Sequence, residues 1–160
     1  MTTTPPIAHD SPYGADLDVE HRRWHEITAL CRSLSPVERE RPGYYSDHDW
    51  TVKDLVAHLG MWFAEADLQL QRIRAGTYEE QPLDVDARNA EALDALREQS
   101  WSTVWSQAHA ARTLMLATWA DLDKRSDAAD FWTRKAGAEH EGQHLERLHV
   151  WVAELQAARA

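Results

Sequence analysis

Two histidines near the C-terminal end of the chain stand at the spacing of metal ligands. His140 and His144 are four residues apart, in the stretch from Ala138 to Glu146. A helix turns once in about 3.6 residues, so both imidazoles project from one face, about 6 Å apart along the axis. Imidazole nitrogens are common ligands of zinc and related metals. The pair therefore predicts a metal site on a helix.

The apolar residues around this pair predict the direction in which it faces. They share one helical stripe with the two histidines and are Trp132, Ala136, Leu148, Trp151 and Leu155. We therefore expect a last helix over residues 130–157 that turns the pair toward the protein interior.

A third histidine, His58, lies on another strongly predicted helix. Thr51 and Asp54 form a capping-box pattern at its start, and Gly76 marks its end. Its apolar face comprises Val52, Leu55, Val56, Leu59, Trp62, Phe63, Ala66, Leu70 and Ile73. His58 sits on the shoulder of this face. Three imidazoles from two helices could hold zinc, nickel or ferrous iron and leave coordination positions open, as catalytic sites do.

The remaining elements must bring these helices together. Residues 16–34 carry an amphipathic helical pattern, residues 35–38 a capped turn, and residues 86–122 an uneven pattern that predicts a shorter helix joined to a longer one. The sequence shows no period-two run and no Asn-Gly hairpin signal. We predict an all-α domain over residues 16–160, an antiparallel four-helix bundle with an irregular connection between helices 2 and 3. Residues 1–15 are predicted to form a flexible arm.

Composition bounds the class of protein. The 160 residues are 43% hydrophobic and 28% charged, which suits one domain with its own core. No apolar run reaches the roughly 18 residues of a membrane span, and the N-terminus has no secretory pattern, so we expect a cytoplasmic protein without a membrane partner. The net charge of −10 argues against nucleic acid as a partner. The single cysteine, Cys31, excludes an intramolecular disulfide and is predicted to be buried.

The stretch from Trp50 to Leu59 resembles the W-[ST]-x-x-D-L-x-x-H-L signature that opens the second helix of DinB/YfiT-like proteins. Within that family, the stretch is most similar to the motif in the N-terminal domain of mycothiol-dependent maleylpyruvate isomerases. The resemblance spans about residues 16–157. It implies a four-helix bundle, often dimeric, whose metal ligands would be His58, His140 and His144, with zinc as the first expectation.

The chain departs from those isomerases in two respects. They carry Glu where this sequence has His140, and they have a C-terminal substrate domain that is not expected here. The segment from His140 to Glu146 also resembles the H-x-x-x-H-x-E pattern of ergothioneine-pathway sulfoxide synthases, which bind iron and need a large second domain. Small relatives include self-protection enzymes that disarm reactive natural products.

The last helix also contains the H-E-x-x-H pattern of zinc peptidases, in which the Glu is a general base. Arg147 stands where the longer metzincin pattern needs Gly, and no edge strand is predicted to hold a peptide. Both features argue against the peptidase interpretation. Glu141 remains a candidate base beside the metal.

Several other residues are candidates for the wall of a substrate pocket. Trp62 and Trp132 lie within two helical turns of predicted ligands and could form an apolar wall beside the metal. His21 and His25 are a second pair with four-residue spacing, interpreted as surface or pocket-wall residues. Arg134 is interpreted as solvated, with binding of a substrate carboxylate as the alternative.

Three functions are open at this point. In the first, the metal activates a low-molecular-weight thiol, such as mycothiol or bacillithiol by resemblance, which is transferred or added to an electrophilic metabolite. In the second, activated water hydrolyses a reactive natural product. In the third, the chain is a non-catalytic, metal-stabilised homodimer that binds a small ligand.

Overall fold

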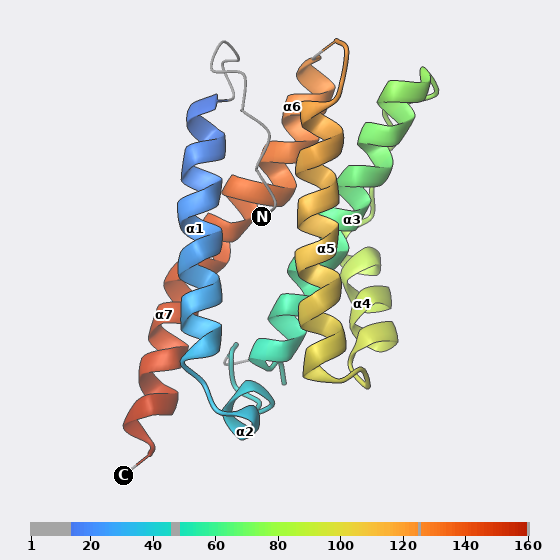
Figure 1. The fold of residues 1–160 in the computed structure, drawn as a ribbon. Helices are drawn as coiled ribbons and strands as arrows, with labels where there is room; N and C mark the ends of the chain where they lie inside the picture. The colour runs from blue at the N-terminus through green and yellow to red at the C-terminus, as the bar shows by residue number, and fades with distance from the viewer. Residues whose placement is uncertain (1–13, 46–48, 125, 160) are drawn as a thin grey trace.

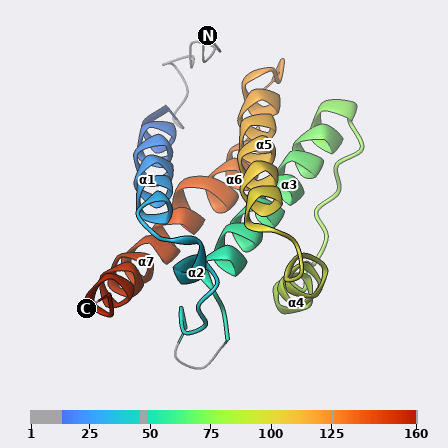
Figure 2. The ribbon, with the colours of Figure 1, turned by 60° about the horizontal axis from the view of Figure 1, so that its bottom comes forward.

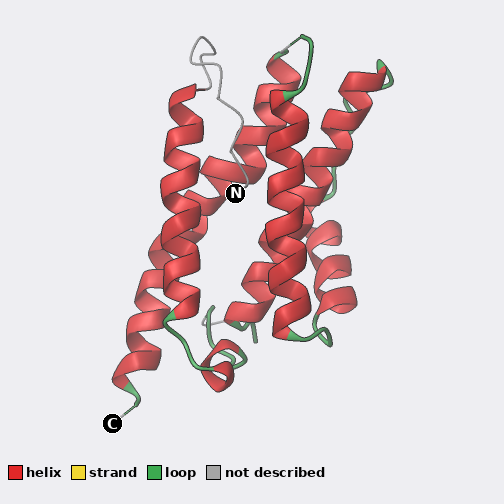
Figure 3. Ribbon diagram, in the orientation of Figure 1, coloured by secondary structure: helices red, strands yellow, loops and turns green. Residues whose placement is uncertain are grey.

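The computed structural model describes residues 14–45, 49–124 and 126–159, and this part of the chain is all-helical, with no strand (Figure 3). Of the predicted arm, residues 1–13 lie outside the described residues, while Gly14 already begins the first helix. The elements are α1 (Gly14–Arg32), α2 (Pro36–Arg39), α3 (Val52–Ala75), α4 (Val85–Leu96), α5 (Trp101–Ala120), α6 (Asp127–Arg134), the π-helix η1 (Lys135–Glu139) and α7 (His140–Ala157).

Local signals set the ends of α3 as predicted. The Thr51 hydroxyl accepts from the Asp54 amide at 3.1 Å, and the Asp54 carboxylate accepts from the Thr51 amide at 3.0 Å. At the other end Gly76 adopts the left-handed conformation with φ 74°, which glycine enters without steric cost. The capping box and the glycine stop are both confirmed.

The long helices pack as neighbouring pairs. α3 runs along α5, and α1 runs along α7 (Figures 1 and 2). At Gly60 the approach of α3 to α5 is so close that an added Cβ would lie 3.0 Å from the Cα of Ala108. The predicted irregular connection joins α3 to α5. It consists of residues 77–84, α4 and residues 97–100, and α4 packs on α3. Cys31 is fully buried, as expected.

The last helix differs from the prediction of one element over residues 130–157. It is broken into α6, η1 and α7 at Gly137, whose φ of −92° and ψ of −109° are not helical. The break has a partner on α1, because Arg23 Nη1 donates to the Ala138 carbonyl at 2.6 Å. It also passes close to Glu20, whose Cγ would lie 3.2 Å from a Cβ on Gly137. His140 is therefore the first residue of a new helix, three residues after the kink at Gly137.

Candidate metal centre

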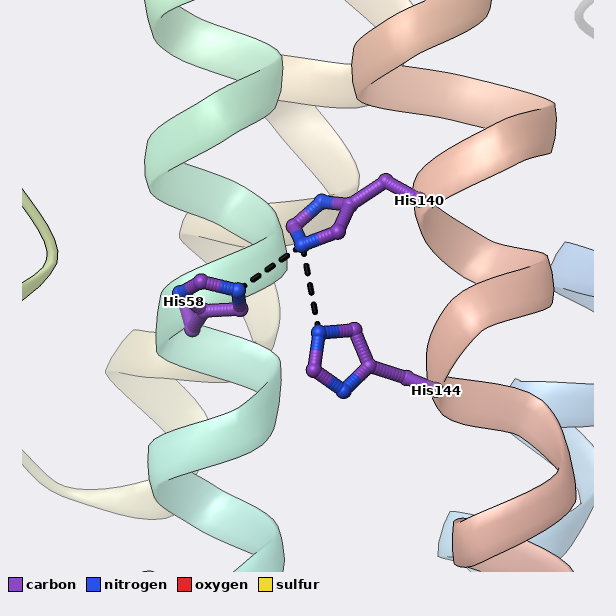
Figure 4. Close-up of side chains that lie close together, drawn as sticks. All are labelled: His58, His140 and His144. Carbon is purple, nitrogen blue, oxygen red and sulfur yellow. Dashed lines mark hydrogen bonds between the residues drawn. The ribbon is translucent and has the colours of Figure 1, made fainter. Parts of the chain in front are cut away.

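The three predicted histidines converge between α3 and α7 (Figure 4). The Nε2 atom of His140 lies 2.8 Å from that of His58 and 3.2 Å from that of His144. Each residue is at most 9% exposed. One ring nitrogen from each lies within 4.8 Å of the other two, so the three can serve one ion.

These separations suit a transition metal. Nitrogen ligands about 2.0–2.1 Å from zinc are roughly 3 to 3.4 Å apart at the angles of octahedral or tetrahedral coordination. The two Nε2–Nε2 separations of 2.8 and 3.2 Å are close to that range. A neutral imidazole has one N–H donor and one lone pair, so three Nε2 atoms aimed at one point are not all satisfied by each other. A shared cation would accept all three lone pairs.

Burial keeps the cluster in the uncharged state that binds metals. Removal from water lowers the pKa of His58 to about 3, of His140 to about 2 and of His144 to about 4, and neighbouring imidazoles add to the effect at the first two. All three rings are therefore neutral at pH 7. No proton has to leave a ring before a metal binds.

Two tyrosines orient the His144 ring from the loop before α3. The Tyr45 hydroxyl lies 2.9 Å from His144 Nδ1 and the Tyr44 hydroxyl 3.2 Å from the same atom. Tyr44 also donates to the His144 backbone carbonyl at 3.1 Å, and burial raises its pKa, so it stays neutral. With Nε2 directed at the cluster, the Nδ1 proton is available to a tyrosine oxygen. Such a contact fixes the tautomer and ring orientation of a metal ligand.

Sequence reasoning missed these tyrosines because nothing periodic marks them. They stand in a short loop that starts after Pro42, and Arg147 of α7 holds that loop by donating to the carbonyls of Gly43, at 3.0 Å, and Tyr44. The available signal was two adjacent aromatic residues in an otherwise polar connection. Loops that a rigid scaffold holds in place commonly carry functional side chains.

A cavity of about 1170 Å³ opens beside the histidines. The predicted pocket residues Trp62, Trp132 and Arg134 all line it, as do the three histidines. Other aromatic residues that line it are Tyr45, Trp50, Tyr78 and Phe131. The Trp50 ring also packs edge-on against His58, with ring centroids 5.0 Å apart. The histidine cluster is thus accessible to a molecule that enters this cavity.

The second predicted histidine pair lies elsewhere. His21 and His25 are on α1 and are not among the residues that line the cavity. His21 is half-exposed, with its Nε2 atom 3.7 Å from a carboxylate oxygen of Glu20, and His25 is exposed. The structure therefore places the pair outside the pocket wall for which it was a candidate.

Glu141, the candidate base, is also outside the cavity. It is fully buried beside Glu20, which is itself fully buried and receives two hydrogen bonds from Arg112, one of them at 2.7 Å. Burial, and then the charge of Glu20, raise the pKa of Glu141 well above its ordinary value. A side chain that does not line the cavity is not placed to accept a proton from a molecule bound there. The H-E-x-x-H pattern thus lacks the geometry of a peptidase base.

Comparisons with protein-family models, with curated proteins and with solved structures found no match to the chain. The resemblance of residues 50–59 to DinB/YfiT-like proteins therefore stays a prediction. None of the helices in the described part of the chain is long and apolar enough to cross a membrane.

Proposed function

We propose that this chain is a metal-dependent enzyme that joins a low-molecular-weight thiol, of the mycothiol or bacillithiol type, to an electrophilic small molecule. The observation that carries the proposal is the convergence of three buried, neutral imidazoles beside a large cavity. A divalent metal, zinc first and nickel or iron as alternatives, would supply a Lewis acid that lowers the pKa of a bound thiol or water.

The chain's own residues support this chemistry in two ways. His58, His140 and His144 would hold the ion with neutral nitrogens, so the ligands would leave its positive charge uncompensated and its acidity high. The cavity of about 1170 Å³ is at least as large as the roughly 300–1,000 Å³ typical of small-molecule sites, which leaves room for a substrate beside a thiol.

The proposal includes the family and the assembly. We infer that α1, α3, α5 and the α6–η1–α7 segment correspond to the four helices of a DinB-like antiparallel bundle, with α4 in its irregular connection. The signature from Trp50 to Leu59 supports this, because it covers the start of α3 and contains His58. As in that family, we expect a homodimer in solution.

Metal content and turnover test the proposal together. We expect about one divalent ion per chain by elemental analysis, and loss of that ion in His144→Ala. His149→Ala is the matched control, because His149 lies on the same helix but is exposed and pairs with Glu26. Metal content unchanged in His144→Ala would refute the ligand set.

Turnover of an electrophile panel separates the three candidate functions. Consumption that needs both metal and thiol supports the proposal. Consumption that needs metal but no thiol would assign the hydrolase instead. Tight binding of a compound with no turnover under either condition would favour the non-catalytic, ligand-binding interpretation.

A further inference from the structure

Aromatic side chains line the cavity from several of the segments that form it. Trp62 comes from α3, Tyr78 from the connection after it, and Trp132 from α6. Large apolar side chains continue to the surface at the rim, where Leu83, Val85 and Phe131 are 37%, 49% and 42% exposed. Exposed apolar side chains that continue an apolar cavity are typical of a ligand site.

The indole N–H groups of Trp62 and Trp132 are already engaged within the protein. Trp62 Nε1 donates to Asn89 Oδ1 at 2.9 Å, and Trp132 Nε1 donates to the Tyr78 hydroxyl at 3.2 Å. Neither indole N–H is then available to a ligand. These tryptophans can contact a ligand through the ring surface, by stacking and dispersion.

The two basic residues of the lining, Arg134 and Lys135, both lie near the Glu139 carboxylate. Lys135 Nζ lies 2.5 Å from Glu139 Oε1, and Arg134 Nε lies 3.9 Å from Glu139 Oε2. Both basic side chains are nearly half-exposed, at 46% and 45%. A ligand carboxylate would compete with Glu139 for either of them in a partly hydrated setting, where an ion pair contributes little.

We propose that the substrate is a largely uncharged molecule with a planar, multi-ring aromatic body, and not a small dicarboxylate. This rests on the proposed function, since it places the electrophilic atom of that molecule at the histidine end of the cavity. The ring system stacks against Trp62 and Trp132 and contacts the apolar rim. The thiol occupies the remaining volume.

Binding of two probes tests this choice without requiring turnover. The apolar probe is Nile red, a neutral, planar, fused-ring dye whose emission shifts to the blue in apolar surroundings, and the acidic probe is maleate, followed by calorimetry. Both are titrated into the metal-loaded chain. Trp62→Ala and Trp132→Ala are compared with Trp101→Ala, a control because Trp101 is a partly buried tryptophan outside the cavity, stacked on Trp105. Circular dichroism checks that each variant is folded.

We expect blue-shifted binding of Nile red, weakened about tenfold in Trp62→Ala and in Trp132→Ala and unchanged in the control. Binding of maleate more tightly than the dye would overturn the inference. So would dye affinity that is equal in all three tryptophan variants and the wild type, because the dye would then bind elsewhere. The protein could also fail to retain a metal and still bind the dye, with weaker binding in Trp62→Ala and Trp132→Ala. That result would reject the proposed metal-dependent function but support the proposed class of ligand.

Discussion

Replacement of Glu141 by Gln separates the base suggested by the H-E-x-x-H pattern from the buried side chain in the structure. Glu141 is fully buried beside the Glu20 side chain and is not part of the cavity lining. Gln has nearly the same shape and keeps a hydrogen-bond donor. We therefore expect kcat/KM within about twofold of wild type, whereas loss of a general base costs roughly 100- to 10,000-fold.

The same change has a signature in the pH dependence of folding. The pKa of Glu141 is raised in the folded state, so the folded chain keeps a proton that the unfolded chain releases above about pH 4.5. The stability contributed by this proton is complete below that pH and falls as the pH rises toward the folded-state pKa. The free energy of unfolding changes by about 1.4 kcal/mol for each pH unit in that window. Gln carries no titrating proton, so the variant gains stability relative to wild type as the pH rises.

Urea unfolding at pH 5, 6 and 7 measures that difference. Glu146→Gln is the control, since Glu146 lies on the same helix and is exposed. We expect the free energy of unfolding of Glu141→Gln, relative to that of wild type, to increase from pH 5 to pH 7. The control should follow wild type. A difference that is constant over this range would refute the raised pKa. A large loss of kcat/KM in a folded Glu141→Gln protein would refute the placement of this residue outside the reaction.

Three further perturbations follow from the site and the packing. Tyr45→Phe removes the hydroxyl that lies 2.9 Å from His144 Nδ1 and should weaken zinc binding 10- to 100-fold in chelator competition. Tyr78→Phe should leave zinc binding unchanged, because Tyr78 lines the cavity but its hydroxyl contacts Trp132. Gly60→Ala should lower the free energy of unfolding by about 1 kcal/mol, because overpacking against α5 outweighs the gain in helix propensity; a stability at or above wild type in urea would contradict this contact. The pKa values of the three cluster histidines are lowered in the folded state, so the free energy of unfolding of the metal-free protein should fall as the pH falls below about 6.5. Each histidine contributes about 1.4 kcal/mol per pH unit to this loss, and urea unfolding should find the loss smaller when one of the three is replaced by Ala.

The sequence by itself determined the helical class, the ends of α3 and the three imidazoles. These depend on interactions within a few residues: Thr51 and Asp54 cap each other, and Gly76 supplies the left-handed conformation. The histidines could be found because each lies on a predicted apolar face or its shoulder, and a buried face must meet another helix. Local physics and burial are both encoded in the spacing of residue types.

Tertiary structure decided how the last helix bends and what surrounds the histidines. The break at Gly137 is stabilised by Arg23, which is 115 residues away from Ala138 in sequence and whose contact no helical period reveals. The same holds for the Tyr45 hydroxyl at His144, 99 residues apart, and for Glu141, whose neighbours on α1 and α5 take it out of the cavity. Side chains that meet only after the helices pack leave no pattern in either segment alone, because each local sequence is compatible with many partners.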